Sequence, residues 1–280
     1  MSDVRVWVNG DLVDPGAPSI SALDHGITVG DGAFETCKVV DGEVFALTRH
    51  LRRMDRSLAG LGLPTADHGL IRKGVDAVLS LGPLPFGRLR FTVTGGPGPP
   101  GSDRADSALT TLVTAGPQPR PPVSTTVVVV PWTRNERAAT AGLKTTSYAD
   151  NVVALAYAKQ RGAHEAVFAN TRGNLCEGTG SNVFVVAGGR VLTPPLADGP
   201  LAGITRELVL EWAAADGLPV QEATMPVSVL GTCDEAFLTS STRDVAAIGV
   251  VDGRELAAPG PLTARVASVF AARAAERMDP

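Results

Sequence analysis

The chain reads Leu-Lys-Thr-Thr-Ser-Tyr at residues 143–148 and Glu-Gly-Thr-Gly-Ser-Asn at residues 177–182. Only four lysines occur, at positions 38, 73, 144 and 159, so a lysine among small polar residues calls for a reason. A lysine amine can lose its proton and attack a carbonyl, whereas an arginine guanidinium stays charged. The neighbouring hydroxyls suit a carbonyl cofactor that carries a phenolic oxygen and a phosphate. Lys144 is therefore a candidate for Schiff-base chemistry, against the alternative of a solvated surface lysine.

Composition and missing motifs argue against several classes of protein. The net charge is −4 at pH 7 with both signs interspersed, so no basic surface for nucleic acid or a membrane is expected. No signal-like segment or membrane-length apolar run is seen, which predicts a cytoplasmic protein. Cys37, Cys176 and Cys233 lie far apart without metal-ligand spacing, so we expect buried, reduced thiols and no metal site. Motifs of P-loop proteins, serine hydrolases and metalloproteases do not occur either.

The order of expected elements indicates an α+β protein of two domains. Asn9-Gly10 and Asp41-Gly42 are expected as the turns of two early hairpins. The Pro-rich segment 117–122 is expected to link a small domain, 1–116, to a larger one, 123–280, which contains Lys144. Strands and helices do not alternate at βαβ spacing, which disfavours a doubly wound sheet. Strands are expected at 4–8, 12–13, 35–40, 44–47, 88–94, 109–114, 123–130, 165–169, 182–186, 191–193, 220–223, 235–239 and 246–251, and helices at 49–59, 71–81, 149–161, 205–215 and 262–277.

Glu177 stands in a glycine-rich turn ahead of the apolar strand 183–186. Such a carboxylate can hold a pyridine nitrogen in its protonated form, so that the ring withdraws electrons from a carbanion. The alternative is an exposed turn residue without a ligand. The glycines lead into a strand instead of opening a helix, so they are not a dinucleotide-binding fingerprint.

Three further segments are candidates for binding an anion. Gly203-Ile204-Thr205-Arg206 begins an expected helix, whose first N–H groups suit a phosphate. Thr239-Ser240-Ser241-Thr242 gathers hydroxyls at a strand end, where they suit a phosphate or a carboxylate. Arg53, on the helix that includes His50, could add a positive charge. An ordinary capped helix, a polar turn and a solvated arginine are the alternatives.

These signals follow one another in an order that resembles the class IV aminotransferases, the fold-type IV pyridoxal-phosphate enzymes. That family includes D-amino-acid and branched-chain aminotransferases and aminodeoxychorismate lyase. The resemblance implies a small N-terminal α/β domain, a larger pseudo-barrel domain, and a homodimer whose partner loops close each site. The motifs that carry it lie at Gly30–Thr36, His50–Arg53, Leu143–Lys144, Glu177–Phe184, Gly203–Arg206 and Asp234–Thr242.

The resemblance also implies a role for each candidate residue. Lys144 would bind pyridoxal 5'-phosphate as a Schiff base and move the α-proton of the substrate. Glu177 would pair with the pyridine nitrogen, and Tyr148 would approach the phenolic oxygen. The residues expected to hold the phosphate are Arg53, Ile204, Thr205, Ser240 and Ser241, and Val29 and Thr242 are expected to contact the substrate.

Departures from the family pattern bear on the substrate. A branched-chain enzyme usually has a tyrosine where this chain has Val29 and a glutamate where it has Ser181. These two differences make a branched-chain enzyme less expected. The forms Ser-Asn-Val-Phe and Thr-Ser-Ser-Thr look more like those of D-amino-acid aminotransferases.

The substrate carboxylate needs a cation that the family pattern does not supply here. The arginine and histidine of the D-specific loop fall on Pro100 and Ser102 in this chain. Arg88 and Arg90 lie two residues apart on an expected strand and therefore share a face. We hypothesise that Arg90, with Arg88 in support, binds the carboxylate, against the alternative of a polar surface.

The expected reaction transfers an amino group from a small amino acid, preferably a D-amino acid, to a 2-oxo acid such as 2-oxoglutarate or pyruvate. An aminodeoxychorismate lyase is the first alternative, because the motif Gly30–Thr36 and the Ala-Gly-Leu-Lys context are shared with that enzyme. An L-branched-chain or (R)-amine aminotransferase is another. A non-catalytic pyridoxal-phosphate-binding protein is disfavoured, since Lys144 and Glu177 are both present.

Overall fold

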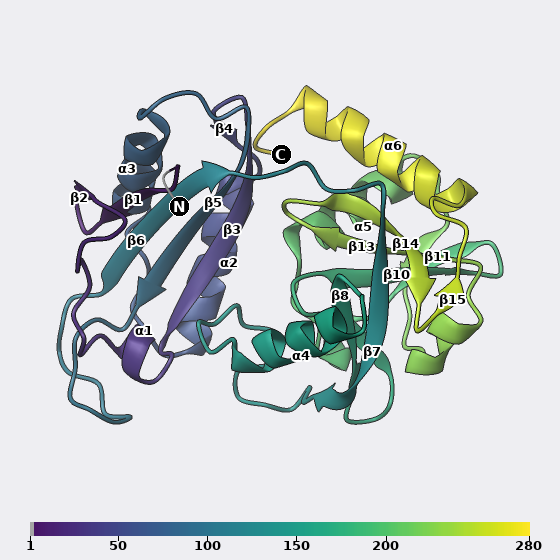
Figure 1. Ribbon diagram of the computed structural model, residues 1–280, viewed down its shortest axis with the longest axis horizontal. Helices are drawn as coiled ribbons and strands as arrows, with labels where there is room; N and C mark the ends of the chain where they lie inside the picture. Colours follow the sequence, from purple (N-terminus) through teal and green to yellow (C-terminus); the bar gives the residue numbers. More distant parts are fainter. Residues whose placement is uncertain (1–2) are drawn as a thin grey trace. The chain divides into compact units, whose positions relative to one another are not determined.

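The computed structural model describes residues 3–280, which divide into two compact units (Figure 1). Unit 1 contains the chain up to Arg120 together with Leu143–Tyr148 and Met278–Pro280. Unit 2 contains Pro121–Gly142 and Ala149–Arg277. The prediction had placed Lys144 in the second domain, whereas its segment packs in unit 1. Among the described residues, no helix is long and apolar enough to cross a membrane.

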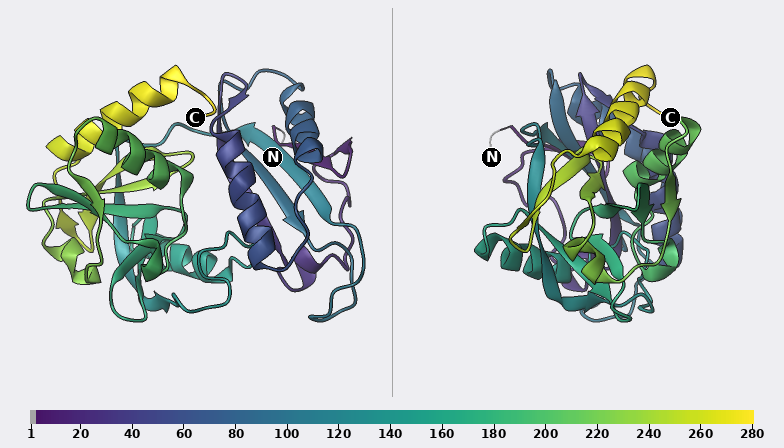
Figure 2. Two further views of the ribbon diagram at one scale, coloured as in Figure 1. Left: turned by 180° about the vertical axis from the view of Figure 1, so that it is seen from behind. Right: turned by 90° about the vertical axis from the view of Figure 1, so that its right-hand side faces the viewer.

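Unit 1 is built on an antiparallel sheet with the strand order β2-β1-β6-β5-β3-β4. The helices α2 and α3 pack on it and close a core that includes Trp7, Leu51, Met54 and Phe91 (Figure 2). The strands are β1 (Arg5–Val8), β2 (Asp11–Val13), β3 (Gly32–Val40), β4 (Glu43–Val44), β5 (Phe86–Thr94) and β6 (Thr110–Pro117), and the helices are α1 (His25–Thr28), α2 (Leu47–Gly60) and α3 (His68–Leu79).

Both expected hairpin turns are confirmed by their backbone conformation. Asn9 and Gly10 have φ of 49° and 127°, and Asp41 and Gly42 have φ of 50° and 83°. Positive φ at both central residues is the conformation that asparagine, aspartate and glycine favour in such turns, and it matches the twist of the flanking strands. The strand expected at 44–47 is wrong in part, because β4 ends at Val44 and α2 begins at Leu47.

The helix α2 presents two different faces. Leu47, Leu51, Met54 and Leu58 are buried in the core of unit 1, at helical spacing. His50, Arg53 and Ser57 form a second, polar row that is also buried. This polar row brings the helix to the candidate site.

The N-terminus of α2 is capped by a segment from the far end of the chain. Ala46, at the N-cap position, has no side-chain acceptor and adopts φ of 56°. Asp279 accepts hydrogen bonds from the Thr48 N–H at 2.9 Å and from the Thr48 hydroxyl at 2.6 Å. The Ala46 N–H donates to the Met278 carbonyl at 2.7 Å. Asp279 therefore takes the part that an N-cap side chain usually plays.

Unit 2 is built on a sheet with the order β12-β11-β10-β13-β14-β7-β8-β9, in which β9 also pairs with β10. That pairing, between Asn182 and Glu177, closes the path from β10 to β9 into a ring. The strands are β7 (Ser124–Arg134), β8 (Glu165–Asn170), β9 (Leu175–Gly178), β10 (Asn182–Ala187), β11 (Arg190–Thr193), β12 (Val220–Glu222), β13 (Glu235–Ser240), β14 (Asp244–Val251) and β15 (Arg254–Glu255), and the helices are α4 (Ala149–Gln160), α5 (Ile204–Ala215) and α6 (Pro261–Glu276).

Most elements of unit 2 lie where the sequence predicts them, within a few residues. The exception that matters for the site is Glu177, which lies on strand β9 instead of in a turn. The four-residue strand is too short to show a clear alternation. Cys37, Cys176 and Cys233 are buried free thiols, as expected, and burial raises the pKa of each.

Candidate active site

Lys144 is held at the edge of the sheet of unit 1. The Phe34 N–H donates to the Lys144 carbonyl at 3.0 Å, and the Thr146 N–H donates to the Gly32 carbonyl at 2.8 Å. The Lys144 N–H donates to the Ser57 hydroxyl on α2 at 3.1 Å. The segment therefore pairs beside β3 through an isolated antiparallel bridge, and these backbone bonds fix the position of the Lys144 Cα.

Glycines make room for this segment in two places. A Cβ on Gly60, in the last turn of α2, would lie 2.6 Å from Leu143 Cδ2. Gly30, at φ of 70°, would place a Cβ 2.5 Å from the Ser147 hydroxyl oxygen, which in fact donates a hydrogen bond to the Gly30 carbonyl at 3.0 Å. A side chain on Gly60 would therefore displace the Leu143 side chain, and one on Gly30 would also be strained by the positive φ.

Lys144 and Arg90 both contact the ring of Phe34. The Lys144 Nζ lies 4.4 Å from the ring centroid, and the Arg90 guanidinium carbon lies 3.7 Å from it. Tyr148 packs edge-on against the same ring, with centroids 5.2 Å apart. One aromatic ring thus gathers the candidate catalytic amine, the candidate carboxylate-binding cation and the candidate partner of the phenolic oxygen.

The arginines of β5 share a face, as predicted. Arg88 and Arg90 are both exposed, while Leu89 and Phe91 between and beside them are buried in the core. Partial desolvation lowers the pKa of Arg90, and the charge of Arg88 lowers it further. A bound carboxylate would relieve this repulsion between the two cations.

Arg53 belongs to a buried cluster of charges. Its Nε and Nη2 donate to Glu35 at 2.8 and 2.6 Å, and His50 Nδ1 lies 2.6 Å from the same carboxylate. Burial by itself would raise the pKa of Glu35, but Arg53 and His50 outweigh it and lower the pKa to about 2. Burial lowers the pKa of His50, against the opposing effect of Glu35. Glu35 therefore fixes the orientation of the arginine that was predicted to reach the phosphate.

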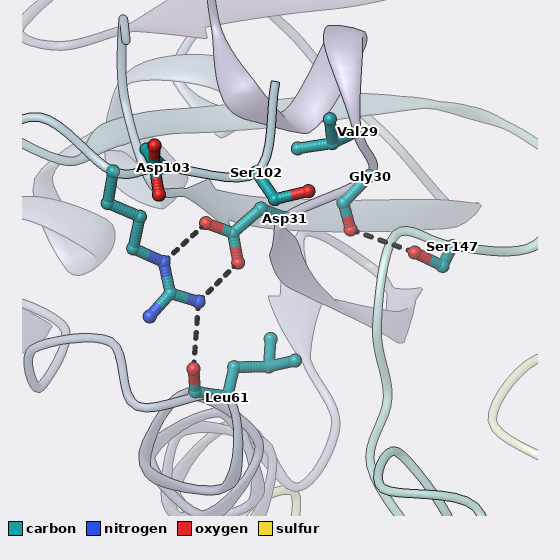
Figure 3. A pocket seen from close by; sticks show the side chains of 8 residues that line it. Val29, Gly30, Asp31, Leu61, Ser102, Asp103 and Ser147 are labelled. Carbon is teal, nitrogen blue, oxygen red and sulfur yellow. Dashed lines mark hydrogen bonds and ion pairs between the residues drawn. The ribbon is translucent and has the colours of Figure 1, made fainter. Parts of the chain in front are cut away.

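A pocket of about 510 Å³ lies beside Val29 and Ser147 in unit 1 (Figure 3). Arg104 closes one side of it through Nε and Nη2, which donate to Asp31 at 2.7 and 2.6 Å, and Nη2 also donates to the Leu61 carbonyl at 2.8 Å. Arg104 belongs to the loop 95–109, in which the D-specific cation was sought at Pro100 and Ser102. Arg104 was not predicted from the sequence, although an arginine in a Gly/Pro-rich loop was a visible signal.

Glu177 in unit 2 accepts a backbone hydrogen bond and forms an ion pair. The Leu201 N–H donates to its Oε2 at 2.9 Å, and Arg134 Nε lies 3.5 Å from its Oε1. The guanidinium of Arg134 stacks over the Phe168 ring at 4.3 Å and donates to Asn151 at 3.0 Å. Arg134 is a second residue that the sequence analysis missed, because it lies 43 residues before Glu177 in the chain.

The N-terminus of α5 meets the requirement for an anion site. Gly203 is its N-cap, so no side chain caps the first N–H groups, which belong to Ile204 and Thr205. A Cβ on Gly203 would collide with the side chain of Asn182, whose amide donates to the Leu201 carbonyl at 2.8 Å. A side chain at Gly203 would therefore displace the Asn182 side chain from this position.

The hydroxyl cluster at the end of β13 is the third part of the site in unit 2. Thr239 is buried, and its hydroxyl has no hydrogen-bond partner in the structure. Ser240 accepts a hydrogen bond from Arg243 Nε at 3.1 Å. Ser241 and Thr242 follow in the turn that leads to β14.

The structure groups the predicted site residues by unit. Unit 1 contains Lys144, Tyr148, Arg53, Arg88, Arg90 and Val29. Unit 2 contains Glu177, Ile204, Thr205, Ser240, Ser241 and Thr242. Within residues 3–280, no cluster of His, Cys, Asp and Glu side chains could hold a metal ion.

The described residues thus include a lysine beside the edge of one sheet, and a closed mixed sheet that bears a carboxylate next to a helix with an uncapped N-terminus. Residues 32–251 match the family model of the class IV amino-transferases. The chain therefore belongs to the class IV aminotransferases. These enzymes depend on pyridoxal 5'-phosphate.

Curated relatives cover nearly the whole chain. A putative branched-chain-amino-acid aminotransferase of Methanocaldococcus jannaschii is 30% identical over 90% of this chain and 89% of its own length. A D-alanine aminotransferase of Bacillus licheniformis is 29% identical over 94% of each chain. A bifunctional aminodeoxychorismate lyase / D-amino acid transaminase of Mycobacterium tuberculosis is 29% identical over 95% of this chain and 96% of its own.

Solved structures confirm the fold expected from the resemblance. A hypothetical aminotransferase of Mycobacterium tuberculosis, in its PLP-bound form, superposes with a TM-score of 0.86 and 27% identity, over 98% of this chain and all of that one. The predicted α+β fold with a small domain and a larger pseudo-barrel domain is therefore confirmed.

The side chains and backbone groups of this chain fit that cofactor. Lys144 supplies a primary amine, and Glu177 supplies a carboxylate held by Arg134 and the Leu201 N–H. The open N-terminus of α5 and the buried, unpartnered hydroxyl of Thr239 offer donors of the kind that a phosphate requires.

Proposed function

We propose that this protein transfers the amino group of small amino acids, D-amino acids in preference to L-branched ones, to a 2-oxo acid such as 2-oxoglutarate or pyruvate. The observation that carries the proposal is the contact of Lys144 and Arg90 with one ring, that of Phe34. An α-amino acid presents its reacting carbon next to a carboxylate, so a catalytic amine and a cation in one place suit that substrate. The D-alanine aminotransferase of Bacillus licheniformis supports the preference for D-amino acids.

Each residue in this proposal has a distinct task. Bound pyridoxal phosphate supplies a ring that withdraws electrons from the α-carbon of the substrate. Lys144 would accept and return the proton of the reacting carbon, and Glu177 would pair with the ring nitrogen. The proposed phosphate contacts are the N–H groups of Ile204 and Thr205, the hydroxyls and N–H groups of Ser240 and Ser241, and Arg53.

Substrate recognition belongs to unit 1 in this proposal. Arg90 binds the carboxylate with Arg88 in support, Tyr148 approaches the phenolic oxygen, and Val29 contacts the substrate side chain. Thr242 of unit 2 adds a hydroxyl to the substrate side of the site.

Absorbance spectroscopy of the cofactor-loaded protein tests the reaction. We expect D-alanine and D-glutamate to convert the lysine-bound cofactor to its pyridoxamine form, and L-leucine to leave it unchanged. Conversion by L-leucine alone would establish the branched-chain alternative, and conversion by a primary (R)-amine alone would establish the amine alternative.

Replacing Arg90 by leucine tests substrate binding. A lost charge-assisted hydrogen bond should raise the Michaelis constant for 2-oxoglutarate by roughly ten-fold or more, with a smaller change in kcat. Arg88→Leu should have a smaller effect. Arg120→Leu is the matched control, because Arg120 also lies over an aromatic ring of unit 1, that of Phe86, at 4.8 Å. An unchanged Michaelis constant in Arg90→Leu contradicts the assignment.

A lyase is the second candidate function. The bifunctional relative of Mycobacterium tuberculosis combines aminodeoxychorismate lyase and D-amino acid transaminase in its name, and this chain carries the motif Gly30–Thr36. Release of pyruvate from aminodeoxychorismate without accumulation of the pyridoxamine form would identify this activity.

Two further predictions concern assembly and location. Sedimentation tests the homodimer whose partner completes the site, and cell fractionation tests the cytoplasmic location.

A further inference from the structure

Glu165, the first residue of β8, is a buried carboxylate that neither the family resemblance nor the proposed reaction uses. Only 3% of its surface is exposed. It accepts hydrogen bonds from the Thr179 N–H at 3.0 Å, the Thr179 hydroxyl, the Ser181 hydroxyl at 3.2 Å and Arg243 Nη2 at 2.6 Å. A buried charge of this kind is stable only when donors and an opposite charge surround it.

The donors from Thr179 and Ser181 belong to the turn that follows Glu177. That turn joins β9 to β10, and the Gly178 N–H donates to the Ser181 carbonyl at 2.8 Å. The Asn151 amide also donates to the Thr179 carbonyl. Glu165 therefore fixes the chain directly after the residue that is assigned to the pyridine nitrogen.

Arg243 belongs to a different turn, the one between β13 and β14. Its Nε donates to the Ser240 hydroxyl at 3.1 Å, and its backbone N–H donates to the Ser240 carbonyl at 3.2 Å. The remaining side of the guanidinium reaches Glu165. One side chain thus connects the buried carboxylate with the turn that carries Ser241 and Thr242.

We propose that Arg243 and Glu165 are positioning residues for the cofactor phosphate. The ion pair fixes the Ser240–Ser241 turn relative to the turn after Glu177, and so sets the spacing between the groups that would hold the two ends of the cofactor. The planar guanidinium suits this task because it bonds a carboxylate and a hydroxyl in fixed directions at once. This inference rests on the proposed phosphate contacts of Ser240 and Ser241.

Binding of two cofactor forms to the full-length apoprotein tests the inference. Pyridoxal phosphate and pyridoxal differ only in the phosphate, so a residue that positions the phosphate turn changes the affinity for the first and not for the second. We expect Arg243→Met to weaken pyridoxal phosphate binding by about ten-fold and to change pyridoxal binding by less than about two-fold, as measured by absorbance titration. Equal losses for both forms, or no loss, would overturn the proposal.

Conservative and control variants sharpen the experiment. Arg243→Lys can keep the ion pair with Glu165 but lacks the second arm to Ser240, so its loss should lie between those of wild type and Arg243→Met. Arg254→Met is the control, because Arg254 is an arginine of unit 2 on the exposed strand β15, and it donates to the carbonyls of Leu230 and Cys233. It should not change the ratio of the two affinities.

A Ser240→Ala/Ser241→Ala double variant separates this inference from the proposed function. If the double variant leaves the ratio of the two affinities unchanged, the proposed phosphate contacts are wrong. If the double variant lowers the ratio while Arg243→Met and Arg243→Lys do not, only the positioning role is wrong. Thermal unfolding of each apoprotein shows whether the variant is folded.

Discussion

Two buried carboxylates, Glu35 in unit 1 and Glu165 in unit 2, show two ways of keeping a negative charge inside a protein. Glu35 is fully buried and is bonded by two side chains of α2, those of Arg53 and His50. Glu165 is bonded by one arginine and by hydroxyl and backbone donors. Each carboxylate orients an arginine. Arg53 is a proposed contact of the cofactor phosphate, and Arg243 is proposed to position the turn that holds it.

The two carboxylates differ in how far water can reach the arginine beside each of them. Arg53 is buried, with 4% of its surface exposed, so water can replace little of what Glu35 provides. The Arg243 side chain is 23% exposed, so water can replace part of what Glu165 provides. The comparison indicates that unit 1 depends on charge pairing, whereas unit 2 depends on a network of neutral donors.

The largest effect is expected for Glu35→Gln. The amide keeps the size of the side chain but removes the negative charge beside the buried Arg53 guanidinium, which should lower the free energy of unfolding by about 3 kcal/mol. Urea unfolding measures it. Glu43→Gln, at an exposed position of β4, is the control and should change stability little. A Glu35→Gln protein as stable as wild type would show that charge pairing does not support unit 1.

Acid should remove the same stabilisation. Arg53 and His50 hold the pKa of Glu35 at about 2, below its ordinary value of 4.5. A carboxyl group whose pKa is lower in the folded state stabilises the protein fully above about pH 4.5, and this contribution is lost as the pH falls toward 2. Unfolding free energy measured against pH should therefore decline less steeply in Glu35→Gln than in wild type. Parallel curves would contradict the account.

A smaller effect is expected for Glu165→Gln. The amide oxygen can still accept from Thr179, the Ser181 hydroxyl can turn to accept from the amide nitrogen, and Arg243 is partly solvated, so the loss should be about 1–2 kcal/mol. The same urea experiment measures it. A loss equal to or greater than that of Glu35→Gln would break the distinction between the two carboxylates.

The smallest effect is expected for Asp279→Ala. This carboxylate lies at the surface of unit 1 and caps α2 through the Thr48 N–H and hydroxyl. Loss of a cap costs about 1 kcal/mol. Hydrogen exchange of the first turn of α2 should increase in the variant, while exchange in α3 should not change. Unchanged protection at Thr48 and Arg49 would show that Asp279 does not act as the cap.

The sequence predicts the main chemistry because its signals are local. Lys144 stands among hydroxyls, Glu177 among glycines, and Gly203 at the start of a helix, and each of these patterns can be recognised within a few residues. The hairpin turns and most strands are predicted for the same reason. Chain order then connects the separate signals into one family pattern.

The partners of these residues could not be predicted, because they depend on topology. Arg243 lies 78 residues from Glu165, and Arg104 lies 73 residues from Asp31. No local pattern relates the members of these pairs. The assignment of Leu143–Tyr148 to unit 1 has the same origin, since it depends on hydrogen bonds to β3 and on the space left by Gly60.

The attachment site of the cofactor is the most direct test of the account. Treating the cofactor-loaded protein with borohydride fixes the cofactor to its lysine, and peptide mass spectrometry then identifies that lysine among the four in the chain. The account predicts the added mass on the peptide that contains Lys144. Added mass on the peptides of Lys38, Lys73 or Lys159, with none on that of Lys144, would contradict it.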